Sequence, residues 1–323
     1  MQAALDSRFR GNERMKTSAG NSLMTEQIAI IGFGEAGQHI GRGLAAEGTA
    51  RLAAYDLRHA ERQLIEAAQG AGIALQDSSA AATKGAAIIF SLVTASSAVD
   101  AARAAAPHLK AGQTYIDFNS VSPMTKRAVA EAIAPSGAAF VEAAVMAPVP
   151  GPNHKVPVLV SAPGASEIAS RLNAIGMKVD VAGERIGDAS LSKMLRSIFI
   201  KGIEALMLES LVAARHAGIE ERILDSVQKT LPGIQWRELA AYNLERTYAH
   251  GKRRAAEMFE SAATVAELGL DPFVTEGIAR RIQWAHEQLN GVEFPGGKPT
   301  TYQEVLDVLE AKLAASKRRD AAE

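Results

Sequence analysis

The stretch QIAIIGFGEAG, residues 27–37, decides the fold of this chain. It has the pattern of a short buried strand, a glycine turn and the start of a helix, with glycines spaced G-x-G-x-x-G. Gly32 allows the tight turn, Gly34 lets the backbone approach a pyrophosphate, and Gly37 lets the helix pack close to the strand. Free N–H groups and the positive dipole at the start of that helix attract phosphate. The pattern predicts a dinucleotide site made by Gly32, Phe33, Gly34, Glu35, Ala36 and Gly37; an ordinary glycine-rich turn is the alternative.

A carboxylate at the end of the second predicted strand supports the dinucleotide interpretation. Asp56 ends the strand 51–56 and lies 19 residues after Gly37, where a dinucleotide fold places the carboxylate that holds the adenosine ribose. Asp56 would accept both ribose hydroxyls and repel a 2′-phosphate, which favours NAD. Arg58, two residues further on, can hold a 2′-phosphate and favours NADP. We expect NAD, with NADP as the alternative.

The composition excludes several classes of protein and of site. A chain of 323 residues suggests about two domains, and 47% apolar residues supply a core. A net charge of −1 favours neither nucleic acid nor a membrane surface as a partner. The absence of cysteine excludes disulfides, thiolate catalysis and cysteine-ligated metals, and it is compatible with a reducing cytoplasm. The seven histidines show no ligand spacing such as H-x-x-x-H, so no metal is expected.

Residues 1–24 do not fit the pattern of the rest of the chain. Basic residues stand there among Gly, Asn and Ser, without the apolar segment of a signal peptide. Met24 directly precedes the first predicted strand and would be a natural start. We expect a disordered tail from an over-extended start codon; a genuine flexible arm is the alternative.

Short apolar runs alternate with helical patterns from residue 27 to about 185. The predicted strands are 27–32, 51–56, 86–92, 113–118, 138–145 and 156–161. The predicted helices are 35–47, 58–71, 96–106, 122–133 and 165–174. Such alternation indicates a mostly parallel sheet covered on both faces. We expect an α/β Rossmann domain with a doubly wound sheet over 25–186.

Strand patterns end near residue 186, and long helical patterns follow. They cover 188–217, 220–230, 235–247, 252–268, 272–289 and 301–316, with Gly218, Gly251, Gly269 and Gly291 as stops. We expect an all-α domain over 187–316 and a short tail over 317–323.

The first helix of that domain carries a polar stripe on a largely apolar surface. Lys193, Ser197, Lys201 and Glu204 stand at i, i+4, i+8 and i+11, which places them in one narrow stripe at about 100° per residue. Burying unpaired charge is costly, so the stripe needs an explanation. It faces either a water-filled site or an internal ladder of ion pairs, in which Lys201 with Glu204 is the obvious pair. Asp188 or Ser190 can cap this helix.

Taken together, these motifs resemble the β-hydroxyacid dehydrogenases, which include the 3-hydroxyisobutyrate, tartronate semialdehyde and 6-phosphogluconate dehydrogenases. The resemblance spans about residues 26–290 and includes the pattern G-x-x-x-x-x-K-x-x-x-(N/S) from Gly187. Lys193 matches the family's lysine, which the resemblance implies is the general base toward the substrate hydroxyl. Ser197 stands where the family usually has asparagine, so the polar contacts to substrate must differ. Lys201 is a further candidate for substrate binding.

Two strand ends resemble the family's cofactor and substrate segments. Residues 117–123, DFNSVSP, resemble its D-x-S-T-x-x-P, which would place Asn119 beside both nicotinamide and substrate and Ser120 beside substrate. A helix N-cap at Ser122 with Pro at the first helical position fits the same residues. Val93 and Thr94 would line the cofactor site, unless they only pack beside the strand.

Two further segments bear on the substrate. Residues 142–148, EAAVMAP, replace the family's D-A-P-V-S-G-G, whose backbone N–H groups bind the substrate carboxylate. Met146 therefore joins the candidate substrate residues, and the proline that follows has no N–H to offer. The segment HGKRRAAEM, 250–258, is a basic helix start from which Arg253 or Arg254 could fork onto an acid group. A solvated helix start or a dimer salt bridge is the alternative.

The resemblance implies an NAD(P)-dependent oxidoreductase that acts on a small β-hydroxy acid and forms a homodimer through the all-α domain. One alternative is an imine-reducing enzyme, against which Lys193 argues. Another is a decarboxylating 6-phosphogluconate-type enzyme, for which Glu204 is the candidate acid if it faces the site. The third is a dinucleotide-binding sensor without catalysis, since fold alone does not fix function.

Overall fold

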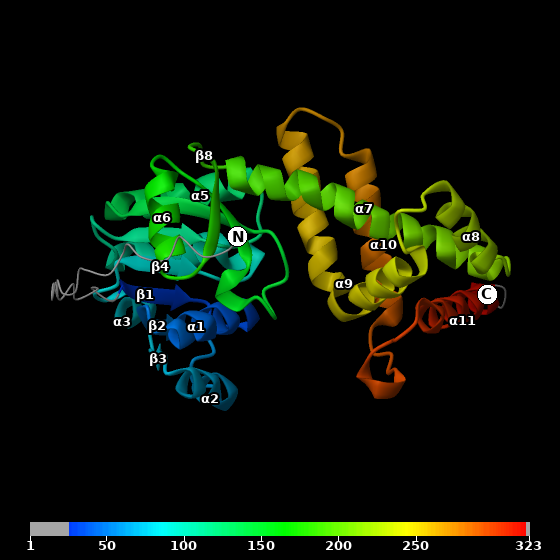
Figure 1. Ribbon diagram of the computed structural model, residues 1–323, viewed down its shortest axis with the longest axis horizontal. Coiled ribbons are helices and arrows are strands. Elements are labelled where there is room, and N and C mark those ends of the chain that lie inside the picture. Colours follow the sequence, from blue (N-terminus) through cyan, green and yellow to red (C-terminus); the bar gives the residue numbers. More distant parts are fainter. Residues whose placement is uncertain (1–25, 321–323) are drawn as a thin grey trace, which may run out of the picture.

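The structure, a computed structural model, describes residues 26–320 in an α/β part and a helical part (Figure 1). Its sheet has the strand order β3-β2-β1-β4-β5-β6-β7-β8. The strands are β1 (Glu26–Ile31), β2 (Ala50–Tyr55), β3 (Ala74–Leu75), β4 (Ile88–Ser91), β5 (Thr114–Asp117), β6 (Ala139–Val145), β7 (Pro157–Ser161) and β8 (Lys178–Gly183). All neighbours pair in parallel except β6 with β7. The predicted Rossmann fold and its mostly parallel sheet are confirmed.

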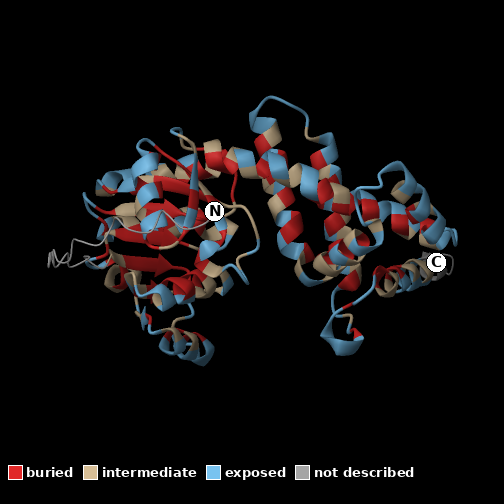
Figure 2. Ribbon diagram, viewed as in Figure 1, coloured by how far each residue is buried: buried red, intermediate tan, exposed pale blue. Residues whose placement is uncertain are grey.

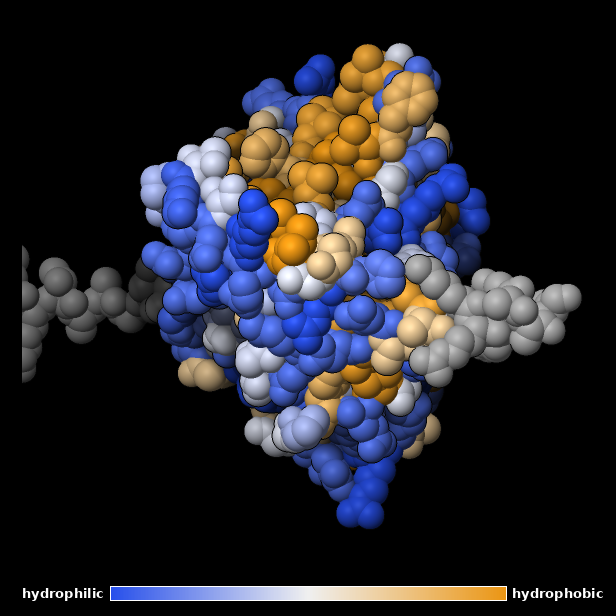
Figure 3. Space-filling model, turned by 90° about the vertical axis from the view of Figure 1, so that its right-hand side faces the viewer, coloured by the Kyte–Doolittle hydropathy of each residue, from blue (hydrophilic) through white to orange (hydrophobic). Residues whose placement is uncertain are grey.

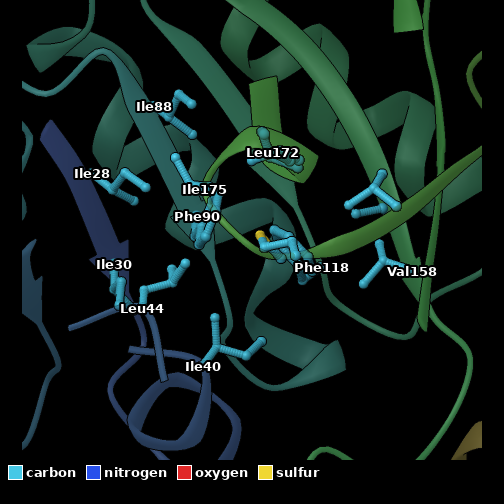
Figure 4. Packing of buried hydrophobic residues seen from close by; sticks show 14 of the residues in the cluster. Ile28, Ile30, Ile40, Leu44, Ile88, Phe90, Phe118, Val158, Leu172 and Ile175 are labelled. Atoms are coloured by element: carbon cyan, nitrogen blue, oxygen red, sulfur yellow. The ribbon is translucent and has the colours of Figure 1, made fainter. Parts of the chain in front are cut away.

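Helices cover both faces of the sheet. They are α1 (Glu35–Glu47), α2 (Arg62–Ala71), α3 (Ser79–Thr83), α4 (Ala98–Ala105), α5 (Pro123–Ile133) and α6 (Ala165–Ala174). One core cluster joins strand residues such as Ile28 and Phe90 to Ile40 and Leu44 of α1, which Figure 4 shows converging. A second cluster, on the opposite face, joins Tyr115 of β5 to α4 and α5. Because the strands are buried on both faces, they read as continuous apolar runs (Figure 2).

The helical part consists of α7 (Asp188–His216), α8 (Glu220–Thr230), α9 (Trp236–Glu267), α10 (Phe273–Leu289) and α11 (Tyr302–Asp320). The long helix α7 runs from the sheet into the helical part, where α9 and α10 pack across it (Figure 1). Leu208 and Leu244 of α7 and α9 share a core with Leu306 of α11. The expected all-α arrangement is confirmed.

The helix break expected at Gly251 is wrong, because α9 continues through it from Trp236 to Glu267. A Cβ placed at Gly251 would lie 2.7 Å from the Cβ of His286 on α10. The glycine therefore serves close packing of two helices rather than a chain reversal. The sequence shows a glycine in both cases, so only the tertiary contact separates them.

The other differences between the predicted and the observed elements lie in short elements, at the edge of the sheet and at the ends of helices. Sequence patterns missed β3, α3 and β8, of which the first two span only two and five residues. The edge strand β8 leaves Val181 exposed and has little apolar pattern. Helix α2 begins at Arg62 rather than at 58, and α11 continues to Asp320 rather than ending at 316. The expected tail over 1–24 lies outside the described residues.

Candidate functional site

The glycine turn between β1 and α1 has the geometry that its sequence predicts. Gly32 has φ +93°, and a Cβ there would lie 2.5 Å from the carbonyl oxygen of Leu92. A Cβ at Gly37 would lie 2.2 Å from the carbonyl oxygen of Gly32, so only glycine lets α1 start this close to β1. Nothing lies within 4 Å of a Cβ at Gly34, and no side chain caps α1 there. The turn is thus open on the side where a pyrophosphate would bind.

Asp56 lies beside this turn and is held by backbone donors. Its Oδ2 accepts the N–H of Phe33 at 2.8 Å, and its Oδ1 accepts the N–H of Arg58 at 3.0 Å. The Arg58 guanidinium lies 3.5 Å from the same carboxylate and 3.7 Å from that of Glu61. Each carboxylate oxygen has a second lone pair, so Asp56 can still accept a ribose hydroxyl. Arg58 is already shared between two carboxylates, which leaves less of its charge for a 2′-phosphate.

Val93 and Thr94 follow β4 on the other side of the glycine turn. The backbone nitrogen of Val93 would lie 2.8 Å from a Cβ at Gly32. Val93 is half-buried against the second core cluster, whereas Thr94 is exposed. Val93 therefore lies beside the turn and also packs on the core, and the cofactor contact expected of Val93 and Thr94 stays a prediction.

A buried polar network supports the end of β5. Lys126, 1% exposed, donates to the Asp117 carbonyl at 2.6 Å, to the Asp117 carboxylate at 2.7 Å and to the Ala143 carbonyl at 3.2 Å. Asn119 donates to that same carboxylate and, at 3.0 Å, to Ser91 Oγ. Its own Oδ1 is buried and without a hydrogen-bond partner. This unused acceptor beside the glycine turn fits a donor such as the nicotinamide carboxamide.

Lys193 on α7 reaches across to this strand end. Its Nζ donates to Ser120 Oγ at 2.5 Å, although the two residues lie 73 positions apart. Burial lowers the pKa of Lys193 to about 8; Glu257 opposes this shift, while Lys126, Lys201 and Arg253 add to it. An amine with a pKa this close to neutrality can both take up and release a proton in a reaction.

Glu142, a fully buried residue of β6, fixes the start of α7. Its carboxylate accepts the N–H groups of Gly187 at 2.7 Å, Ala189 at 2.6 Å and Ser190 at 2.9 Å. Ser161 Oγ donates to it at 2.7 Å. Neither Asp188 nor Ser190 caps the helix, because the N-cap residue is Gly187 and the capping charge comes from the sheet. Glu142 therefore anchors the start of α7. Lys193 lies on that helix, six residues after the N-cap Gly187.

The polar stripe of α7 divides into two parts. Lys193 and Ser197 are half-buried at the junction of the two parts of the molecule, whereas Lys201 and Glu204 are buried inside the helical part. The expected pair of Lys201 with Glu204 is wrong. Lys201 instead donates to Glu257 on α9 at 2.6 Å, and Glu204 accepts Thr247 Oγ1 at 2.7 Å. The ion-pair alternative thus holds for the second half of the stripe, with partners from α9. A site facing Lys193 and Ser197 stays a prediction.

Arg253 and Arg254 differ in their surroundings. Arg254 is 9% exposed and forks onto Glu204, with Nε at 3.1 Å from the carboxylate. Arg253 donates to Glu257 at 3.0 Å but leaves 57% of its side chain exposed. Only Arg253 of this pair presents a guanidinium to the outside.

Helix α9 also contacts α5, and its His250 lies within electrostatic range of Glu35 at the start of α1. The charge of Glu35 acts on His250, whose pKa is lowered by burial and by Arg246. Glu260 accepts the backbone N–H of Ser122 at 2.8 Å, next to the N-cap hydroxyl that Ser122 itself supplies to α5. The predicted cap at Ser122 is confirmed, and α9 adds a second one.

Comparison with known proteins agrees with this geometry. Residues 27–183 match the NAD binding domain of 6-phosphogluconate dehydrogenase, and residues 214–285 match a domain of unknown function, DUF1932. A conserved hypothetical protein from Sinorhizobium meliloti 1021 is 43% identical, covers 89% of this chain and 97% of its own, and superimposes with a TM-score of 0.73. Conserved protein MTH1747 of unknown function, reported as structurally similar to 3-hydroxyacid dehydrogenases, is 32% identical, with 80% and 96% coverage and a TM-score of 0.66.

The chain belongs to this 3-hydroxyacid dehydrogenase-like family. The 3-hydroxyisobutyrate dehydrogenase of Mycobacterium tuberculosis shares the fold at 15% identity, with 88% of this chain and 99% of that chain covered and a TM-score of 0.67. The resemblance inferred from the sequence is confirmed, and this family member carries an NAD-binding Rossmann domain.

At the end of the segment EAAVMAP, 142–148, two backbone positions have no N–H free for a ligand. Met146 is half-buried at the end of β6, and its backbone N–H donates to the carbonyl of Pro157 at 2.9 Å. Pro148 is exposed and has no N–H. A substrate carboxylate would therefore find fewer backbone donors here than in the motif with Ser-Gly-Gly.

Sequence reasoning missed two carboxylates of this site, Glu142 and Glu257. Glu142 opens the segment EAAVMAP, where an acidic residue in the middle of a predicted apolar strand was the available signal. Glu257 lies four residues after Arg253, a spacing that favours an ion pair on a helix. Among residues 26–320, no cluster of His, Asp and Glu is arranged to hold a metal. In the same range, no helix combines the length and hydropathy that a membrane crossing requires.

Glu142→Gln tests the anchoring of α7. The amide would turn an N–H₂ group toward backbone donors and leave at least one of them unpaired, so we expect a loss of about 1–3 kcal/mol in the free energy of unfolding. Urea denaturation measures it, with Glu131→Gln on the exposed face of α5 as a control that changes stability by less than about 0.5 kcal/mol. Equal midpoints for the two variants would contradict the anchoring role.

Proposed function

We propose that this protein is an NAD(P)-dependent oxidoreductase that transfers a hydride between nicotinamide and the carbinol carbon of a small β-hydroxy acid. One observation carries the proposal: the Lys193 amine lies 2.5 Å from Ser120 Oγ, which follows β5. In the sheet β5 is the neighbour of β4, and the residues after β4 contact the glycine turn. A base with a pKa of about 8 beside the expected nicotinamide position suits removal of a hydroxyl proton.

In the oxidation direction, neutral Lys193 takes the proton of the substrate hydroxyl, and the carbinol carbon gives up its hydride. Nicotinamide, when bound, supplies the hydride acceptor. Ser120 orients the Lys193 amine, and Asn119 offers its unpaired Oδ1 to the carboxamide. In the reverse direction, protonated Lys193 gives its proton to the carbonyl oxygen. The network of Lys126 and Asp117 keeps Asn119 in place by filling its surroundings with hydrogen bonds.

For the substrate's acid group, Arg253 is the basic residue that this proposal assigns. Lys201 and Arg254, also named from the sequence, are each held by an internal carboxylate. Met146 and Ser197 border the same region and would shape the remaining contacts. Asp56, held beside the glycine turn, supports NAD as the preferred cofactor, and Arg58 leaves NADP as the second choice.

The decarboxylating alternative loses its candidate acid. Glu204 is fully buried and accepts hydrogen bonds from Thr247 and Arg254 inside the helical part, so it does not face the site. Imine reductases share this fold at 16% identity, but a lysine base suits an alcohol substrate better. We therefore favour oxidation of a carbon–hydroxyl bond.

Lys193→Met tests the proton transfer. It should lower kcat for hydroxy-acid oxidation by about 10²–10⁴-fold, while NAD affinity stays unchanged because the glycine turn is untouched.

In the wild type, kcat/KM for oxidation should rise with pH and level off above about pH 8, since the base must be neutral. For the reduction direction, kcat/KM should fall above about pH 8. Lys193→Arg, which stays protonated, should also be inactive. Turnover in either variant with the same pH limb would refute the role.

We also propose a homodimer formed through the helical part. Phe199 and Leu206 of α7 and Phe273 and Val274 of α10 are each more than 70% exposed. The two helices are adjacent, since Gly202 of α7 lies against Ile278 of α10. Figure 3 shows hydrophobic surface gathered over the upper part of this end of the molecule. An exposed apolar area of this kind fits contact with a second copy of the chain.

Sedimentation equilibrium tests the dimer. We expect a mass of two chains for the wild type and of one chain for Phe199→Asp, because a buried carboxylate without a partner would oppose the contact. Glu209→Gln, an exposed change on the same helix, should leave the mass at two chains. A wild-type mass of one chain would contradict the proposal.

A further inference from the structure

An ion cluster between α7 and α9 lies along the helix that carries Lys193. Glu257 of α9 is its centre: one carboxylate oxygen accepts Lys201 Nζ at 2.6 Å, and the other accepts Arg253 Nη1 at 3.0 Å. The side chains of Lys201 and Glu257 are only 7% and 18% exposed. Charges this poorly solvated act on their neighbours over longer distances than surface charges do.

The cluster is unbalanced toward positive charge. Helix α9 lies against α7 next to Lys193, since Ser261 Oγ, one turn beyond Glu257, donates to Met194 Sδ at 3.4 Å. Lys193, Lys201 and Arg253 thus stand on this contact of α7 with α9, against the carboxylate of Glu257. The other nearby acid, Glu204, is already engaged by Arg254 and Thr247. From the sheet side, Lys126 of α5 adds a further cation, which Asp117 largely neutralises.

Each member acts on Lys193 with a definite sign. Burial lowers the pKa of Lys193, and Glu257 is the charge that opposes this, whereas Lys126, Lys201 and Arg253 lower it further. Lys201, Lys193 and Arg253 in turn hold the pKa of Glu257 at about 2 against the effect of burial. Glu257 is therefore a fixed negative charge over the whole working range of pH and does not itself exchange a proton.

We propose that Glu257 is a positioning residue that sets the protonation state of Lys193, with Lys201 as the opposing cation. The inference rests on the proposed function, because a tuned Lys193 matters only if it exchanges a proton. It also assigns Lys201 a role other than substrate binding. A purely structural ion pair between α7 and α9 is the competing explanation, and the two differ in what they predict for Lys193.

The opposite signs provide the test. Glu257→Gln removes the carboxylate that pairs with Lys201 and Arg253 and leaves these two cations unopposed, so Lys193 should lose its proton at lower pH. Lys201→Met removes a cation and frees the Glu257 carboxylate, so Lys193 should lose its proton at higher pH. A purely structural ion pair would lower the stability of both variants without shifting the pKa of Lys193 in opposite directions.

The experiment is competitive acetylation of the folded chain with trace acetic anhydride across pH, read at the Lys193 peptide by mass spectrometry. This measures the free amine directly and needs no substrate. At pH 7 we expect the deprotonated fraction of Lys193 to rise about three- to tenfold in Glu257→Gln and to fall by a similar factor in Lys201→Met. Glu238→Gln, the same charge change at an exposed position in the first turn of α9, should leave it unchanged.

Thermal melting and circular dichroism establish that each variant is folded. If Glu257→Gln does not fold, the double variant Lys201→Met/Glu257→Gln replaces it, because it leaves neither member of the buried pair without its partner. Its deprotonated fraction of Lys193 should exceed that of Lys201→Met alone. Shifts of the same sign in Glu257→Gln and Lys201→Met, or no shift in the folded variants, would overturn the inference. Opposite shifts together with full turnover in Lys193→Met would support the ion cluster and contradict the proposed function instead.

Discussion

The structure depends on one buried carboxylate, Glu142, at the start of α7. A charge with no exposed surface is stable only when donors surround it, and Glu142 has three backbone N–H groups and two serine hydroxyls. The positive end of the α7 dipole adds to this. Because α7 runs on into the helical part, this contact fixes the direction in which that part leaves the sheet, and with it the position of Lys193 over Ser120.

The basic residues of α7 and α9 differ in their direct partners, and this difference separates them into two groups. Lys201 and Arg254 are held by Glu257 and Glu204, so they stabilise the packing of α7 against α9. Lys193 has a hydroxyl as its direct partner rather than a carboxylate, so burial can lower its pKa toward neutrality. The same helix thus carries both a lysine held in an ion pair and a lysine whose pKa is lowered, according to how each is paired.

The features that sequence predicted well are those that local physics determines. The glycine pattern, the six main strands and the N-cap at Ser122 follow from steric, periodic and hydrogen-bonding rules that act over a few residues. Gly251, the pairing of Lys201 and the capping role of Glu142 depend on which residues meet across 35 to 56 positions, so they could not be read from spacing. The family resemblance supplied the role of Lys193, and the structure supplied its neighbours.

The central claim is hydride transfer between NAD(P) and a small β-hydroxy acid. The measurement that tests it most directly is formation of reduced nicotinamide by the wild-type chain with a panel of such acids, offered NAD and NADP in parallel. The account predicts turnover with at least one acid and a higher rate with NAD than with NADP. No turnover with any of them, in samples shown by calorimetry to bind the cofactor, would contradict it and favour a dinucleotide-binding sensor.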